Sequence, residues 1–76
     1  MPHVIIKLLP GRSEQQKTAL ANAIVADVTT IAKCDVDAVS VAFEEVSSED
    51  WTEKVYRPDI LAHPDRLYKK PGYDPL

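Results

Sequence analysis

The sequence predicts a small α+β protein in which two β-strands flank one α-helix. Three patterns predict it: a run of apolar residues over 3–9, a helical pattern with an N-terminal cap from residue 13, and an alternating apolar pattern over 39–46. A strand, a helix and a strand in this order form a βαβ unit, whose strands are parallel and whose crossover is right-handed.

The first strand is apolar on both sides. β-Branched Val4, Ile5 and Ile6 lie at its centre, and Pro10-Gly11 gives a turn signal at its end. A strand of this kind is typical of a sheet that is covered on both faces, either by helices or by partner subunits.

The helix is expected to begin at Ser13 and to run to about residue 33. Ser13 and Gln16 have the spacing of a capping box, in which each side chain accepts a hydrogen bond from the other residue's backbone. Apolar residues then recur at helical spacing and predict the face that packs on the sheet: Leu20, Ile24, Val28 and Ile31.

In the second strand, Val39, Val41 and Phe43 alternate with more polar residues. Ser47 then offers a second N-cap, followed by a helix that should be short because Pro58 interrupts it. We therefore expect one domain over residues 1–76, with a βαβ core over about 2–46 and a helical and turn segment over about 47–76.

Composition argues against several functional classes. The net charge of −3 and the pI near 5.2 favour neither nucleic acid nor an anionic membrane as a partner. No apolar run approaches the roughly 20 residues of a membrane span. A lone Cys34 cannot form an internal disulfide, so a cytoplasmic location is expected. His3 and His63 are too poorly supported to predict a metal site.

The small size of the predicted sheet leads us to expect that the chain forms oligomers. Two strands and one helix seldom form a stable sheet in water, because three or more strands or additional cover are usually needed. A homo-oligomer that joins sheets across a two-fold axis would supply this cover.

Several residues together resemble the 4-oxalocrotonate tautomerase family. They are Pro2 before a short strand, Gly11-Arg12-Ser13 before a helix with Gln16-Lys17, and a βαβ unit of this length. Trp51 and the segment 69–73 are similar to its small dimeric branch, the phenylpyruvate-enol tautomerases. The resemblance implies a tautomerase fold, a homodimer, and a cofactor-independent isomerase that interconverts the enol and keto forms of a 2-hydroxy-2-alkenoate or aryl enolpyruvate.

The resemblance implies that the nitrogen of Pro2 moves the proton. Proton transfer next to a carbonyl is best served by a base whose pKa lies near the working pH. The amine at the N-terminus of a chain ordinarily has a pKa of about 7.7–8.0. Met1 has to be removed, because an amide nitrogen is not a base. The alternative is that proline is merely tolerated at this position.

The same resemblance implies that Arg12 binds the substrate carboxylate, for which a guanidinium offers two parallel donors. A strand of seven residues spans about 23 Å, so Pro2 and Arg12 of one chain should lie at opposite ends of it. We therefore expect an active site shared between two subunits. The alternative for Arg12 is a solvated loop charge.

Two further site residues follow from the resemblance. Trp51 takes the place of the family's pocket aromatic, although packing at a helix start would explain it as well. Ser40 stands where the type enzyme has a second arginine, which favours a monoacid with an apolar or aromatic tail over a dicarboxylate.

Two alternative functions stay open at this point. The same scaffold and proline can add water to an activated alkene, as hydratases and dehalogenases of the family do. The chain can also be a non-catalytic small oligomeric binding protein in which Pro2 is inert.

Overall fold

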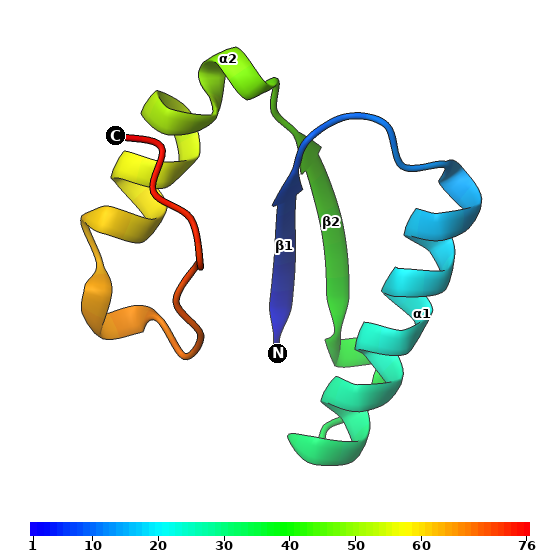
Figure 1. The fold of residues 1–76 in the computed structure, drawn as a ribbon. Coiled ribbons are helices and arrows are strands. Elements are labelled where there is room, and N and C mark those ends of the chain that lie inside the picture. The colour runs from blue at the N-terminus through cyan, green and yellow to red at the C-terminus, as the bar shows by residue number, and fades with distance from the viewer. The chain divides into compact units, whose positions relative to one another are not determined.

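A computed structural model describes residues 1–76 and shows two compact units, Met1–Glu45 and Val46–Leu76 (Figure 1). The first unit holds strand β1 (His3–Leu8), helix α1 (Glu14–Ile31), a 3₁₀ turn (Val36–Ala38) and strand β2 (Ser40–Glu45). The two strands are parallel, so the predicted βαβ unit is confirmed.

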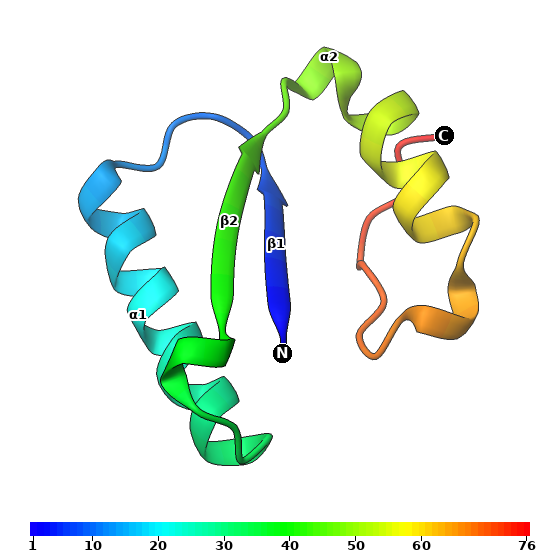
Figure 2. The same ribbon diagram turned by 180° about the vertical axis from the view of Figure 1, so that it is seen from behind.

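The strands pair in a register that runs from His3 opposite Ser40 to Leu8 opposite Glu45. Helix α1 lies along one side of the sheet, as both views show (Figure 2). Lys17 of α1 forms an ion pair with Glu45 and lines a groove together with Phe43. The odd-numbered residues of β2 therefore lie on the side of the sheet that faces α1. Alternation along the strands places six residues on the opposite, open face: His3, Ile5, Lys7, Ser40, Ala42 and Glu44.

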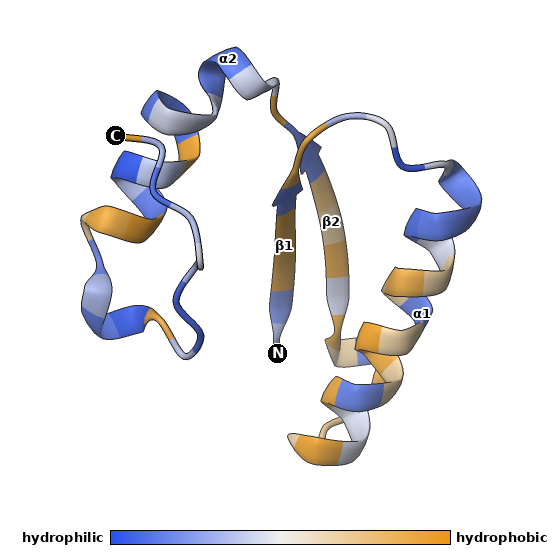
Figure 3. Cartoon of the chain, in the orientation of Figure 1, coloured by the Kyte–Doolittle hydropathy of each residue, from blue (hydrophilic) through white to orange (hydrophobic).

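The open face explains why the strands are less buried than their composition predicts. No residue of the first unit is buried, and Ile5 is 48% exposed even though it lies at the centre of β1. Hydrophobic residues fill the middle of β1 and much of α1 (Figure 3). One helix covers only one face of a sheet, so the predicted cover on both faces is not met within the first unit.

Helix α1 begins as predicted. The Ser13 hydroxyl accepts a hydrogen bond from the Gln16 backbone at 3.1 Å, and the Gln16 side chain accepts one from the Ser13 backbone at 2.8 Å. The helix ends at Ile31, and Lys33 adopts the left-handed backbone conformation that often follows a helix (φ 56°).

The face of α1 that packs on the sheet differs in part from the predicted stripe. Ile24 and Val28 are half-buried, but Leu20 and Ile31 are 44% and 78% exposed. The half-buried residues near the N-terminal end of the helix are instead Lys17 and Ala21. The predicted stripe was therefore correct in the middle of the helix and wrong at both ends.

In the second unit, the helix extends further than predicted. Helix α2 (Ser48–Trp51) is capped by Ser47, whose hydroxyl accepts a hydrogen bond from the Asp50 backbone at 3.3 Å. It continues as a π-helix over Thr52–Leu61 that contains Pro58. The Ala62 N–H donates to the Arg57 carbonyl at 3.0 Å, five residues back. This wider hydrogen-bond spacing is one of the known ways in which a helix accommodates an irregularity such as proline.

Val55 and Tyr56, on this π-helix, are the two buried residues of the chain, at 4% and 8% exposure. The last part of the unit contains a 3₁₀ turn (Pro64–Arg66) and the C-terminal segment, whose Tyr73 ring lies 5.8 Å from the Tyr56 ring. None of the helices combines the length and the apolar character needed to cross a membrane.

Candidate active site

Pro2 lies at the N-terminal end of β1, directly before its first residue. It is half-buried, and its carbonyl accepts a hydrogen bond from the Ser40 backbone N–H at 3.2 Å. This bond extends the parallel pairing of the strands by one step. The structure therefore brings together two of the predicted site residues, Pro2 and Ser40, at one end of the sheet.

The Ser40 side chain has a partner that sequence reasoning did not assign. His3 Nδ1 lies 2.5 Å from Ser40 Oγ, and both residues are exposed on the open face of the sheet. The signal was present in the pairing of the two strands, since a register that sets His3 opposite Ser40 makes their side chains direct neighbours.

Arg12 lies in the connection between β1 and α1. Gly11 precedes it with a backbone φ of 127°, which residues that carry a side chain rarely adopt. The helix cap Ser13 follows it. Arg12 is exposed. The six residues of β1 span about 20 Å, so Arg12 and Pro2 of one chain lie at opposite ends of the strand. The structure separates these two predicted site residues, as the strand length led us to expect.

Trp51 belongs to the second unit, at the end of α2, and is half-buried. Its indole Nε1–H donates a hydrogen bond to the Tyr73 hydroxyl at 2.9 Å. The Tyr73 ring in turn packs on the buried Tyr56 at an interplanar angle of 47°. Tyr73 was not among the predicted site residues, because nothing in the linear sequence connects it with Trp51.

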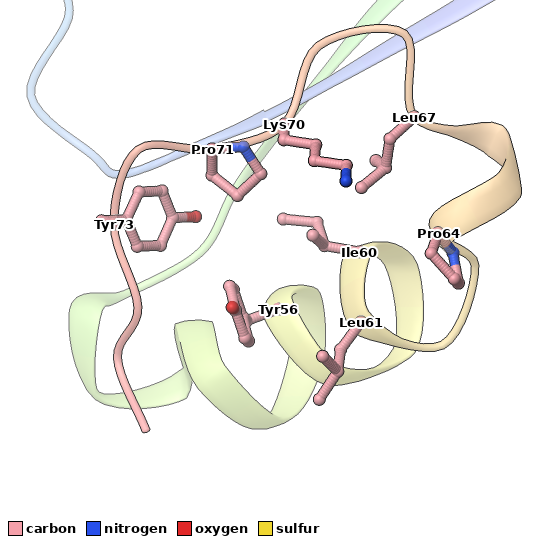
Figure 4. Close-up of a pocket in the computed structure, with 8 residues that line it drawn as sticks. All are labelled: Tyr56, Ile60, Leu61, Pro64, Leu67, Lys70, Pro71 and Tyr73. Atoms are coloured by element: carbon pink, nitrogen blue, oxygen red, sulfur yellow. The ribbon is translucent and has the colours of Figure 1, made fainter.

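The same unit contains an open hollow of about 210 Å³ between the helix and the C-terminal segment (Figure 4). Its lining is mainly apolar, with the ammonium group of Lys70 and the hydroxyls of Tyr56 and Tyr73 as the polar groups. It contains no carboxylate, imidazole or thiol that could move a proton.

The strongest electrostatic feature of the first unit lies on the helix side of the sheet. Lys17 Nζ lies 2.9 Å from a Glu14 carboxylate oxygen and 3.5 Å from one of Glu45. The hydrogen bond with Glu14, followed by the charges of Glu14 and Glu45, raises the pKa of Lys17 above its ordinary value of 10.5. This cluster joins α1 to β2. No three His, Cys, Asp or Glu side chains in the structure group together in a way that could hold a metal ion.

Residues 2–55 match the model of a protein family described as "Tautomerase enzyme". The chain belongs to the tautomerase family. The matched range includes Pro2, Arg12, Ser40 and Trp51, so the resemblance seen in the sequence is confirmed at the level of the family.

Several relatives extend this tautomerase assignment over the full length. A "Probable tautomerase" of Xylella fastidiosa is 45% identical over 76 residues, which cover 100% of this chain and 93% of the relative. "Tautomerase PptA" of Pectobacterium atrosepticum is 40% identical and covers 96% of this chain and 97% of its own. The same-named protein of Escherichia coli O9:H4 is 34% identical over 74 residues, with the same coverage.

The solved structures show the same fold. One that concerns trans-3-chloroacrylic acid dehalogenase activity matches with a TM-score of 0.62 and covers 64% of this chain and 92% of its own. Its sequence identity of 18% makes this a likeness of fold alone. The chain is thus an isomerase of the tautomerase type, built on the βαβ fold of that superfamily.

Proposed function

We propose that this enzyme is a cofactor-independent tautomerase that interconverts the enol and keto forms of a 2-hydroxy-2-alkenoate or an aryl enolpyruvate. Its base is the N-terminal amine of Pro2 after Met1 has been removed. The observation that carries the proposal is the position of Pro2, which lies at the start of β1 with Ser40 bound to its carbonyl, within the range matched by the family.

The chemistry needs one group that accepts and returns a proton. In the ketonisation direction, the Pro2 amine takes the proton of the 2-hydroxyl group while the C3 carbon takes a proton from the resulting ammonium group. The enol C=C double bond becomes a C=O double bond, and no electrons are gained or lost overall. A backbone amine with a pKa near neutrality suits both halves of this transfer.

In this proposal, Arg12 binds the carboxylate of the substrate through its two parallel N–H donors. Because the length of β1, about 20 Å, separates Arg12 from Pro2 within one chain, the arginine of each site comes from a second copy. The exposed central residue Ile5, on the sheet face that the first unit leaves open, supports a homodimer that closes over this face.

Ser40 and Trp51 determine the class of substrate. Ser40 places a neutral hydroxyl beside Pro2, where a dicarboxylate would need a second cation. Trp51 supplies an aromatic wall that suits an apolar or aromatic tail. We therefore propose a monoacid such as phenylenolpyruvate as the substrate type, with no cofactor and with a cytoplasmic location.

The decisive experiment begins with an intact-mass measurement, which should show a chain that lacks Met1. Ketonisation of phenylenolpyruvate is then followed with the wild type and with Pro2→Ala. Pro2→Ala replaces the secondary amine of proline with a primary amine of different basicity and geometry, and we expect kcat/KM to fall about 10²-fold or more, in the range of general acid–base catalysis.

The control for folding is Thr30→Ala, an exposed position late in α1, which should leave the rate unchanged. Retention of Met1 in the active enzyme, or equal rates for the wild type and Pro2→Ala, would overturn the role of Pro2. A parallel assay with 3-chloroacrylate tests the alternative chemistry, and a larger kcat/KM for chloride release than for ketonisation would favour it.

A further inference from the structure

We propose that His3 is a positioning residue that fixes the Ser40 hydroxyl as a hydrogen-bond donor to the 2-oxygen of the substrate. This inference rests on the proposed function, since it assumes that the reacting atoms lie next to Pro2. With His3 as its partner, the neutral Ser40 can donate a hydrogen bond at the position where the type enzyme has a second arginine.

His3 and Ser40 are in direct contact at the N-terminal end of the sheet. His3 Nδ1 and Ser40 Oγ are joined by a short hydrogen bond. The two residues are direct partners in the register of the parallel strands, and the backbone N–H of Ser40 is bound to the Pro2 carbonyl. The pair is therefore held by the sheet beside the proposed base, on a face that no other part of the first unit covers.

The direction of this hydrogen bond decides whether Ser40 can donate to the substrate. If the serine hydroxyl donates to Nδ1, it offers only lone pairs to the substrate, and these repel an oxygen that is gaining negative charge. If Nδ1–H donates to Ser40 Oγ, the serine proton is free to point at the substrate. Loss of the enol proton, or of the C3 proton in reverse, places negative charge on the 2-oxygen, and a fixed donor stabilises that charge.

Charged side chains lie on both faces of the sheet. On the open face, the nearest charged partners along the strands are Lys7 and Glu44, whose side chains form an ion pair at 3.9 Å. One pair, Ile5 and Ala42, separates them from His3 and Ser40 in the register. Helix α1 covers the other face and places its Lys17 cluster there. His3 is the side chain that forms a hydrogen bond with the Ser40 hydroxyl.

The experiment combines three substitutions with a double mutant. Ser40→Ala removes the donor, His3→Leu removes its orienting partner, and His3→Asn keeps a short amide that can replace Nδ1–H. We expect kcat for phenylenolpyruvate to fall about tenfold to a hundredfold in Ser40→Ala and in His3→Leu with little change in KM, because the donor acts mainly in the transition state. His3→Asn should recover to within about threefold of the wild type.

The double mutant His3→Leu/Ser40→Ala should be no slower than Ser40→Ala alone, because residues that act through one hydrogen bond are not additive. Multiplied losses, an unchanged His3→Leu, or a His3→Asn variant as slow as His3→Leu would each overturn the proposal. Thr30→Ala again serves as the control.

A second measurement is independent of activity. ¹⁵N NMR of the imidazole ring should show a proton on Nδ1 in the wild type and a changed Nδ1 signal in Ser40→Ala. An unprotonated Nδ1 that accepts from serine would overturn the assigned direction. If Pro2→Ala retained the wild-type rate while the losses at His3 and Ser40 stayed coupled, the role of Pro2 would fail and the role of this pair would stand.

Discussion

At the scale of single residues, Tyr73 connects the C-terminal segment with two aromatic residues of the helix, Trp51 and Tyr56. The Tyr73 hydroxyl accepts the indole N–H of Trp51 at 2.9 Å, and its ring rests on Tyr56. Trp51 is the only tryptophan of the chain, so its surroundings can be followed by fluorescence. The contact fixes the orientation of the aromatic side chain that we propose for the substrate pocket.

Removal of this hydroxyl by Tyr73→Phe should leave the ring packing in place and release the Trp51 indole. We expect a stability loss of about 1 kcal/mol, a shifted tryptophan emission maximum, and a KM for phenylenolpyruvate raised about threefold. Denaturant unfolding, fluorescence and steady-state kinetics measure the three effects. The matched control is Tyr68→Phe, because Tyr68 is fully exposed. Equal behaviour of the two variants would contradict the role of Tyr73.

At the scale of elements, Lys17 connects α1 with β2 through its ion pairs to Glu14 and Glu45. Its pKa is raised above 10.5 in the folded chain, so this contribution to stability is fully present below the unfolded pKa and is lost as the pH rises through the folded one. The stabilising effect of Lys17 should therefore disappear only in strongly alkaline solution.

Lys17→Met removes the charge and keeps much of the apolar stem. The variant should unfold at a lower denaturant concentration than the wild type at pH 7, and the difference should shrink in strongly alkaline solution, above the ordinary lysine pKa of 10.5. Urea titrations at both pH values provide the measurement. Lys54→Met is the control, since Lys54 is 67% exposed and pairs with Asp50 on the same helix, where ion pairs contribute little. A difference between Lys17→Met and wild type that persisted at the high pH would argue against the ion pairs as its cause.

At the scale of the whole molecule, the open sheet face is the structural reason to expect a second copy. Ile5 on this face and Leu20 on α1 have similar exposed fractions, 48% and 44%. If the sheet face is the interface, Ile5→Lys should shift the enzyme toward monomers and lower its activity, because it places a charge in a desolvated contact. Leu20→Lys should leave the assembly intact. Sedimentation equilibrium distinguishes the two, and identical behaviour would locate the interface elsewhere.

The proposed sharing of the active site between two copies of the chain has its own test. Pro2→Ala and Arg12→Ala should each be nearly inactive alone. After the two proteins are unfolded together in equal amounts and refolded, half of the dimers contain one of each chain, and each mixed dimer has one intact site of two. About a quarter of the wild-type activity should return. No recovery in a mixture whose mixed dimers are demonstrated by mass spectrometry would place Pro2 and Arg12 in the same chain's site.

Local signals in the sequence were sufficient for the elements themselves. The Ser13 cap, the Pro10-Gly11 turn and the alternation around Phe43 each depend on neighbours a few residues apart, and each appears in the structure. The separation of Pro2 from Arg12 also followed from strand length, because the rise per residue in a strand is nearly constant. The family was predictable because its residues stand in order along the chain.

Only the tertiary structure showed which side chains meet. His3 and Ser40 are far apart in the chain, as are Trp51 and Tyr73, and each pair forms only after strands or helices have packed in a particular register. The π-helical path through Pro58 and the burial of Val55 and Tyr56 likewise depend on packing within the second unit. Spacing along the chain determined the backbone elements, because their hydrogen bonds and turns are local. The contacts around Ser40 and Trp51 depended on the tertiary structure, because they join residues that only the folded chain brings together.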